Sequence, residues 1–221
     1  MKRATIALLL IYTAAFAQQK DSFTDPRDEK TYKTVKIGKQ TWMAENLNYD
    51  AEGSKCYGEG GEVEIGYDEN GNPIAITLSP DEIQVNCTKY GRLYIADACP
   101  KGWHLPSREE WQILVDFAGG NKVAGKRLKF KSDWEEDGNG TDDYGFSALP
   151  GGGGSFGLVS DGYWYAGAGS SGSWSGYDCW DEECTESYPS YCTMRHNNEE
   201  VYMNTDIDEH NYLSSIRCVK N

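Results

Sequence analysis

The stretch ACPKGWHLPSREEW, residues 98–111, decides more about the fold than any other part of this chain. Its second half starts a helix, because Ser107 and Glu110 have the spacing of a capping box, in which each side chain accepts a hydrogen bond from the other residue's backbone N–H. The apolar residues that follow recur at the spacing of one helical face; they are Trp111, Leu114, Val115 and Ala118. We therefore predict a main helix over residues 107–118, which stops at Gly119-Gly120 and packs through a single apolar face.

The first half of the same stretch contributes Cys99, and a further cysteine, Cys218, lies in the last strand-like segment, residues 215–220. We predict that these two cysteines form a disulfide. A cross-link that closes so long a loop stabilises a fold by roughly 4 to 5 kcal/mol in the chain-entropy model. That is comparable with the net stability of a typical domain.

The N-terminus has the three parts of a secretory signal peptide: a basic start, an apolar run from Ala4 to Phe16, and small residues before the cleavage site. We predict a signal peptide over residues 1–17, cut after Ala17; an uncleaved anchor is the alternative. The run is shorter than the ~20 residues that span a bilayer, so no transmembrane segment is expected in the mature chain. Since the first cysteine is Cys56, a lipoprotein anchor is not expected, and the protein should be secreted, periplasmic or at the cell surface.

The cysteine count and the charge balance agree with export. Seven cysteines suit an oxidising compartment, and because seven is odd we expect one unpaired thiol. The formal net charge of −14 would become −16 after cleavage, because Lys2 and Arg3 would be lost. This acidity argues against nucleic acid or anionic lipid as a partner.

Turn-forming residues divide the mature chain into short segments. Residues 32–37 and 40–43 flank a two-residue turn that starts with glycine, and residues 62–67 and 74–78 flank a second polar turn, so each pair predicts a hairpin. A short helix, capped by Asn121 and reaching Leu128, should follow the main helix.

From residue 133 onward the chain is rich in Gly, Ser, Tyr, Trp and Asp and has few aliphatic residues until Val201. Such a region orders poorly without cross-links or aromatic packing. Three cysteines lie within it, Cys179, Cys184 and Cys192, and we expect two of them to form a local disulfide.

Six motifs, in this order along the chain, closely resemble the Fibrobacter succinogenes major paralogous domain over about residues 25–221. They are TYKTVKIGKQTWMAENLN (31–48), KYGRL (89–93), CPKGWHLPSREEW (99–111), AGKRLK (124–129), GTDDYGFSALPGG (140–152) and RCV (217–219). The core GWHLPSREEW (102–111) and the closing IRCV (216–219) are also similar to the formylglycine-generating-enzyme branch of the C-type lectin-like fold. The resemblance implies a single C-type lectin-like α+β domain, with short antiparallel strands, one main helix and disulfide staples, after a tail formed by residues 18–24.

The family has no established activity to carry over, and this chain departs from its usual pattern in two places. Residues 59–83 lengthen the loop between Cys56 and Cys87, and the segment from Cys179 to Cys192 adds three thiols. Variable loops on a fixed scaffold are where binding specificity tends to lie. A function particular to this protein is therefore expected there.

No catalytic constellation is supported by the sequence. Gly153-Gly154-Ser155-Phe156-Gly157 matches a nucleophile pattern, but it lacks the strand-to-helix turn of a parallel sheet on which that chemistry depends. A reactive thiol among Cys179, Cys184 and Cys192 would need nearby positive charge, whereas acidic residues surround these cysteines. We expect neither a catalytic residue nor a cofactor.

A metal site is not expected either. The histidines are His104, His196 and His210, and none shows the spacing that places two ligands on one helical face. Asp68-x-Asn70-x-Asn72 and Asp137-x-Asn139-x-Thr141 space oxygens as calcium loops do, but both patterns are incomplete. Turn chemistry explains these residues equally well.

Five aromatic residues separated by Gly and Ser are the candidate ligand-binding residues: Trp164, Tyr165, Trp174, Tyr177 and Trp180. An aromatic face covers the apolar side of a sugar ring, and the alternative is that these rings fill the core of a region poor in Leu and Ile. We predict a secreted, non-catalytic binding module whose partner is a polysaccharide or a cell-surface protein. The alternatives are an oxidase of the formylglycine-generating type, which needs accessible thiols, and a structural cell-surface paralogue.

Overall fold

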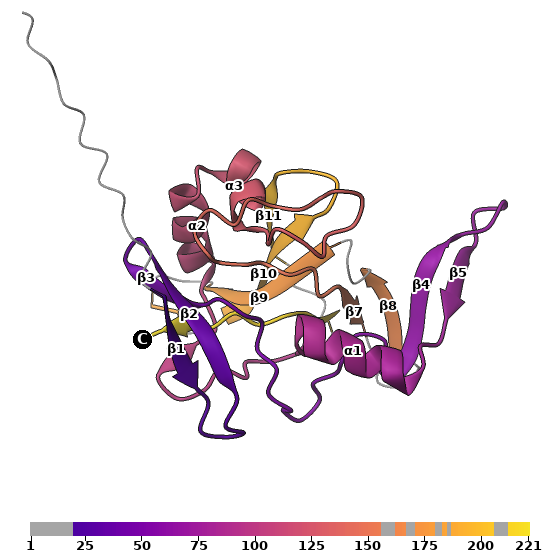
Figure 1. Ribbon diagram of the computed structural model, residues 1–221, viewed down its shortest axis with the longest axis horizontal. Coiled ribbons are helices and arrows are strands. Elements are labelled where there is room, and N and C mark those ends of the chain that lie inside the picture. The colour runs from indigo at the N-terminus through magenta and orange to yellow at the C-terminus, as the bar shows by residue number, and fades with distance from the viewer. Residues whose placement is uncertain (1–19, 156–161, 167–170, 180–182, 185–186, 206–211) are drawn as a thin grey trace, which may run out of the picture.

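The computed structural model describes residues 20–155, 162–166, 171–179, 183–184, 187–205 and 212–221. Within these ranges the chain forms an α+β fold with three short helices, mostly antiparallel strands and three disulfides (Figure 1). The predicted signal peptide, residues 1–17, lies outside the described residues. No helix in the described part of the chain is long and apolar enough to cross a membrane.

The first sheet joins the two ends of the domain. Its strand order is β1-β2-β3-β13-β6, and the bounds are Lys20–Thr24, Thr31–Ile37, Gln40–Met43, Val219–Lys220 and Trp103–His104. The predicted β2–β3 hairpin is confirmed, and Gly38 at its turn has a φ of 59°, which favours glycine. The assignment of residues 18–24 to a tail is wrong for residues 20–24, because β1 pairs along β2.

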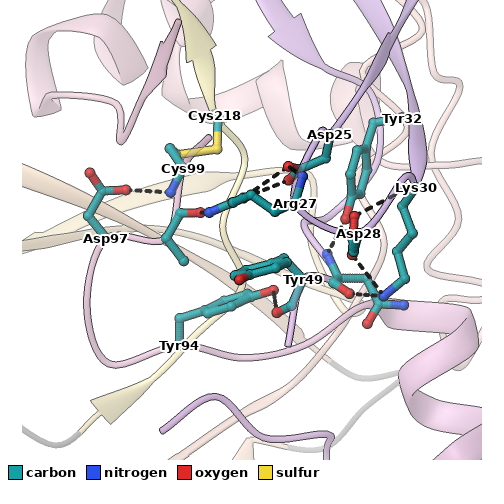
Figure 2. A network of polar contacts seen from close by, with 12 residues as sticks. Asp25, Arg27, Asp28, Lys30, Tyr32, Tyr49, Tyr94, Asp97, Cys99 and Cys218 are labelled. Atoms are coloured by element: carbon teal, nitrogen blue, oxygen red, sulfur yellow. Dashed lines mark hydrogen bonds and ion pairs between the residues drawn. A yellow bond between two sulfur atoms is a disulfide. The ribbon is translucent and has the colours of Figure 1, made fainter. Parts of the chain in front are cut away.

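The predicted disulfide between Cys99 and Cys218 is confirmed, with the Cα atoms 5.9 Å apart. It lies beside a polar network around Arg27, whose guanidinium binds Asp25 at 2.6 Å and donates to the carbonyl of Ala98 at 2.9 Å (Figure 2). The same guanidinium lies 3.9 Å from the centre of the Tyr49 ring. Burial raises the pKa of Asp25, but the hydrogen bonds and charge of Arg27 outweigh it and lower that pKa overall. The network ties the β1–β2 turn to the segment that carries the disulfide.

The second sheet has the order β11-β10-β9, with bounds Val201–Thr205, Ser187–Arg195 and Ser171–Cys179. Helices α2 (Arg108–Phe117) and α3 (Asn121–Leu128) pack beside it (Figure 1). The predicted capping box is confirmed: the backbone N–H of Glu110 donates to the Ser107 hydroxyl at 3.1 Å and that of Ser107 donates to the Glu110 carboxylate at 2.9 Å. Gly120, and not Asn121, is the N-cap of α3; the Asn121 side chain instead donates to the carbonyl of Val201.

The main core lies between these two helices and the first two sheets. Trp42 of β3 and Trp111 of α2 pack with ring centres 4.7 Å apart, and Phe146 lies 5.7 Å from Trp42. All three rings are buried. Aromatic packing therefore compensates for the scarcity of Leu and Ile.

The third sheet has the order β12-β7-β8-β4-β5, with bounds Tyr212–Leu213, Gly153–Ser155, Gly162–Ala166, Gly61–Tyr67 and Pro73–Ile76. The predicted β4–β5 hairpin is confirmed, and it projects away from the rest of the domain (Figure 1). Its second strand ends earlier than expected, because helix α1 (Pro80–Tyr90) follows. This helix was not predicted, although Ser79 and Glu82 form a second capping box. A disulfide between Cys56 and Cys87 closes the whole segment.

Candidate functional site

An open cleft of 240 Å³ lies against the outer face of strands β9 and β10. Its lining residues are Ile95, Ala96, Leu105, Ser175, Gly176, Tyr177, Ser187, Tyr188, Pro189, Tyr191 and Tyr212. We call this site the tyrosine cleft, because four of its lining residues are tyrosines.

Strand alternation decides which side chains reach the tyrosine cleft. Tyr177 lies opposite Pro189 and Ser175 opposite Tyr191, so these side chains share the outer face of the sheet. Trp174 belongs to the opposite face, which packs into the main core. The cleft is therefore built on the reverse side of the strands whose inner face holds the domain together.

The motif that decided the fold also forms one wall of the tyrosine cleft. Leu105 lines the cleft, and the backbone N–H of Tyr177 donates to the carbonyl of Pro106 at 3.1 Å. Gly176 must be small, because a Cβ atom there would lie 2.8 Å from that same carbonyl oxygen. The segment before α2 thus holds the middle of β9 in place.

The C-terminal segment supports the cleft from another side. The backbone N–H of Ser175 donates to the carbonyl of Ser215 at 2.9 Å, and the hydroxyls of Ser175 and Ser214 hydrogen-bond to each other. Tyr212, from β12, meets Tyr191 with ring centres 5.0 Å apart and planes at 78°. This edge-to-face geometry is a favoured one for aromatic pairs.

Phenol groups give the tyrosine cleft hydrogen-bonding ability at neutral pH. Burial raises the pKa of Tyr177, and the negative charges of Glu110 and Asp97 raise it further. Burial also raises the pKa of Tyr188, together with the charge of Asp178. Both phenols therefore stay protonated at neutral pH, and the Tyr188 hydroxyl is hydrogen-bonded to the Asp178 carboxylate.

A charged pair lies beside the cleft. Asp178 is opposite Tyr188 in the strand register and binds Arg108 of α2 at 3.2 Å. Directly after Asp178 the chain enters the disulfide between Cys179 and Cys184, whose partners are five residues apart. Strand β9 thus ends at a cross-linked cysteine.

The structure gives different results for the five aromatic residues that were predicted to bind a ligand. Tyr177 lines the cleft, and its role in ligand binding stays a prediction. The prediction is wrong for Trp174, because its ring is fully buried and its Nε1 donates to Asn46 at 2.9 Å. Trp164 and Tyr165 belong to β8, but their side chains, like the whole of Trp180, lie outside the described residues.

Three tyrosines of the cleft were missed in the sequence: Tyr188, Tyr191 and Tyr212. A signal for Tyr191 was present, because residues 187–195 contain two Tyr and one Thr, residue types that favour a strand. Tyr212 carries no such signal. It joins the cleft only because β12 pairs with β7.

The disulfides agree with the predicted pattern and show which cysteines pair. Six of the seven are paired, and the local disulfide joins Cys179 and Cys184 and leaves Cys192 free and fully buried. Burial raises the pKa of the Cys192 thiol, which keeps it protonated and unreactive. Three disulfides are consistent with an extracellular protein.

The residues that suggested a calcium loop or a nucleophile have structural roles where they are described. Asp68 accepts hydrogen bonds from the backbone N–H groups of Asn70 and Asn72, both at 2.8 Å, and so closes the β4–β5 turn. Ser155 ends β7, which pairs antiparallel with both neighbours, and the next residues of that motif lie outside the described ranges. Among the described residues no three His, Cys, Asp or Glu side chains are grouped as a metal site would need.

The histidines are also explained where they are described. His104 lies between Glu110, at 2.9 Å, and the side chain of Asn221, at 2.6 Å. His196 pairs with Glu136 at 3.2 Å. His210 lies outside the described residues.

The chain is similar to a known protein family. A family model described as Fibrobacter succinogenes major domain matches residues 35–220. No curated protein and no solved structure matches the chain.

Proposed function

Because this chain belongs to the Fibrobacter succinogenes major domain family, we propose that it is an exported, non-catalytic binding module of that family, which holds a carbohydrate in the tyrosine cleft. The observation that carries the proposal is the gathering of four tyrosines around one open cavity. In this proposal the signal peptide over residues 1–17 directs export, and the domain is a C-type lectin-like variant.

The chemistry of the cleft suits a sugar. Ring faces cover the apolar side of a pyranose, and phenol and serine hydroxyls match its hydroxyl groups. At 240 Å³ the cleft falls below the ~300 Å³ at which pockets for drug-sized ligands begin, so it suits one or two sugar units of a longer chain. The net charge of −14 favours a neutral glycan over an anionic one.

The oxidase alternative has less support. That chemistry requires a pair of accessible thiols, whereas six cysteines are paired and Cys192 is buried. A structural cell-surface role remains the competing proposal, and it requires no ligand in the cleft.

The test is binding of the oxidised domain, without its first 17 residues, to a panel of soluble glycans and insoluble polysaccharides. We expect retention on at least one neutral member, and we expect Tyr177→Ala to weaken it at least tenfold. The matched control is Tyr67→Ala, which removes an exposed tyrosine on the distant β4–β5 hairpin and should leave binding unchanged.

Melting temperatures of both variants would verify that each remains folded. No retention on any panel member would favour the structural role. Retention that Tyr177→Ala leaves unaltered would place the ligand elsewhere on the domain.

A further inference from the structure

The segment closed by Cys56 and Cys87 differs from the rest of the domain in both charge and exposed surface. Its acidic residues are Glu59, Glu62, Glu64, Asp68, Glu69, Asp81 and Glu82, and it contains no Lys, Arg or His. The described residues have eight large apolar side chains that are exposed, and five of them lie here: Ile65, Tyr67, Ile74, Ile76 and Val85. Acidic charge and exposed apolar surface therefore coincide in one segment.

The exposed apolar residues continue a buried face. Val63 lies opposite Ile76 in the β4–β5 register, so Val63, Ile74 and Ile76 share one face of the hairpin. Val63 is buried in a small cluster with Tyr57 and Leu93. Ile76, opposite Val63, and Ile74, nearer the hairpin turn, are each 42% exposed.

Strand β5 also ends its sheet. In the order β12-β7-β8-β4-β5 its one neighbour is β4, and the hairpin extends beyond the body of the domain (Figure 1). An exposed apolar edge strand is a template for pairing with another chain, and soluble proteins usually avoid one. The exposed apolar edge of β5 is therefore a candidate site for pairing with a partner chain.

The charge of the segment indicates what that partner is. Glu62, Glu69 and Asp81 make no ion pair within the described residues, so their charges are available to a ligand. A second copy of this chain would bring the same seven acidic residues against their own kind, in a protein of net charge −14. Repulsion thus disfavours self-pairing and favours a basic partner.

We propose that the β4–β5 hairpin is a docking edge for a partner protein that presents an extended segment of alternating apolar and basic residues. The segment adds to the free edge of β5 as a further strand. Its apolar side chains cover Ile74 and Ile76, and its basic side chains meet the acidic residues. This mode of recognition combines backbone hydrogen bonds with alternate side-chain contacts.

The experiment measures binding of two short synthetic peptides to the oxidised domain by fluorescence anisotropy. One alternates valine and lysine, and the other alternates valine and glutamate. We expect the first to bind and the second not to. The double variant Ile74→Ser/Ile76→Ser should weaken binding at least tenfold, whereas Ile113→Ser, a comparably exposed isoleucine on α2, should leave it unchanged.

Two further measurements separate edge pairing from simple charge attraction. The triple variant Glu62→Gln/Glu69→Gln/Asp81→Asn should weaken binding and reduce its salt dependence. Amide hydrogen exchange should slow in β5 when the valine–lysine peptide is added. Tyr177→Ala should have no effect, so failure of the carbohydrate proposal leaves this test intact.

Binding that Ile74→Ser/Ile76→Ser does not weaken, or a peptide that leaves β5 exchange unaltered, would overturn the proposal. So would a wild-type dimer in sedimentation equilibrium that the same variant converts to a monomer, because the occupant would then be a second copy.

Discussion

At the scale of single residues, Arg217 shows how a buried cation organises the core. Its guanidinium donates to the side chain of Asn46 at 2.8 Å, to the carbonyl of Ser147 at 2.7 Å and to the carbonyl of Phe146. Asn46 in turn accepts from Trp174. One side chain thus connects the C-terminal segment directly to two other parts of the chain, and through Asn46 to β9.

Arg217→Met should lower the free energy of unfolding by about 3 kcal/mol or more, because it leaves buried carbonyl groups without donors. Arg127→Met is the matched control, since that guanidinium is partly exposed and its ion pair with Asp143 spans 3.8 Å; it should cost less than about 1 kcal/mol. Urea denaturation of both variants measures the difference. Equal losses would show that Arg217 has no special role.

The free cysteine yields a second prediction at this scale. Cys192 faces the core opposite Trp174 and is fully buried, so a thiol reagent should not react with it in the folded domain. Without reductant, Ellman's reagent should detect no thiol in native conditions and one thiol per chain in denaturant. A count of three or more would contradict the disulfide pattern.

At the scale of elements, the start of α2 is held by a shared carboxylate. Glu110 accepts from the backbone N–H of Ser107 and also binds His104, which in turn contacts the C-terminal residue Asn221. Burial lowers the pKa of His104, but Glu110 and Asn221 outweigh it and raise that pKa overall. One contact therefore joins β6, α2 and the end of the chain.

A raised folded-state pKa means that the His104 contact stabilises the fold fully below the unfolded pKa of about 6.5 and is lost as pH rises through the folded pKa. We expect an NMR titration of His104 to give a pKa above about 6.5. Glu110→Gln, which keeps a capping acceptor but removes the charge, should lower it. An unaltered His104 pKa in that variant would show that Glu110 is not the cause.

At the scale of the whole molecule, the disulfides differ in what they constrain. The Cys99–Cys218 bond spans 119 residues and joins the edge of the main motif to the last strand, whereas Cys179–Cys184 spans five. Figure 2 places the long cross-link next to the Arg27 network, so covalent and polar contacts close the domain together.

Loop closure predicts unequal losses when the two bonds are removed. Cys99→Ala/Cys218→Ala should cost about 5 kcal/mol, and Cys179→Ala/Cys184→Ala about 2 kcal/mol, in the chain-entropy model. Denaturant unfolding of both double variants compares them directly. Losses of equal size would mean that the entropy of the unfolded chain does not account for most of the stabilisation.

Sequence signals that act over a few residues gave correct predictions of local structure. The capping box at Ser107 and the glycine turn at Gly38 predicted α2 and the β2–β3 hairpin, because each depends on hydrogen bonds between near neighbours. The same kind of signal is present at Ser79, where α1 begins, although residues 74–78 predict a longer strand. The pairing of Cys99 with Cys218 was also predicted.

The sequence by itself therefore determined the family, the main helix, two hairpins and the disulfide that closes the domain. Only the tertiary structure decided that Trp174 faces inward while Tyr177 faces a cleft, and that Tyr191 and Tyr212 meet there. Alternation along a strand separates two faces but does not say which one is buried. That choice depends on packing against α2 and the C-terminal segment, which lie far from β9 along the chain.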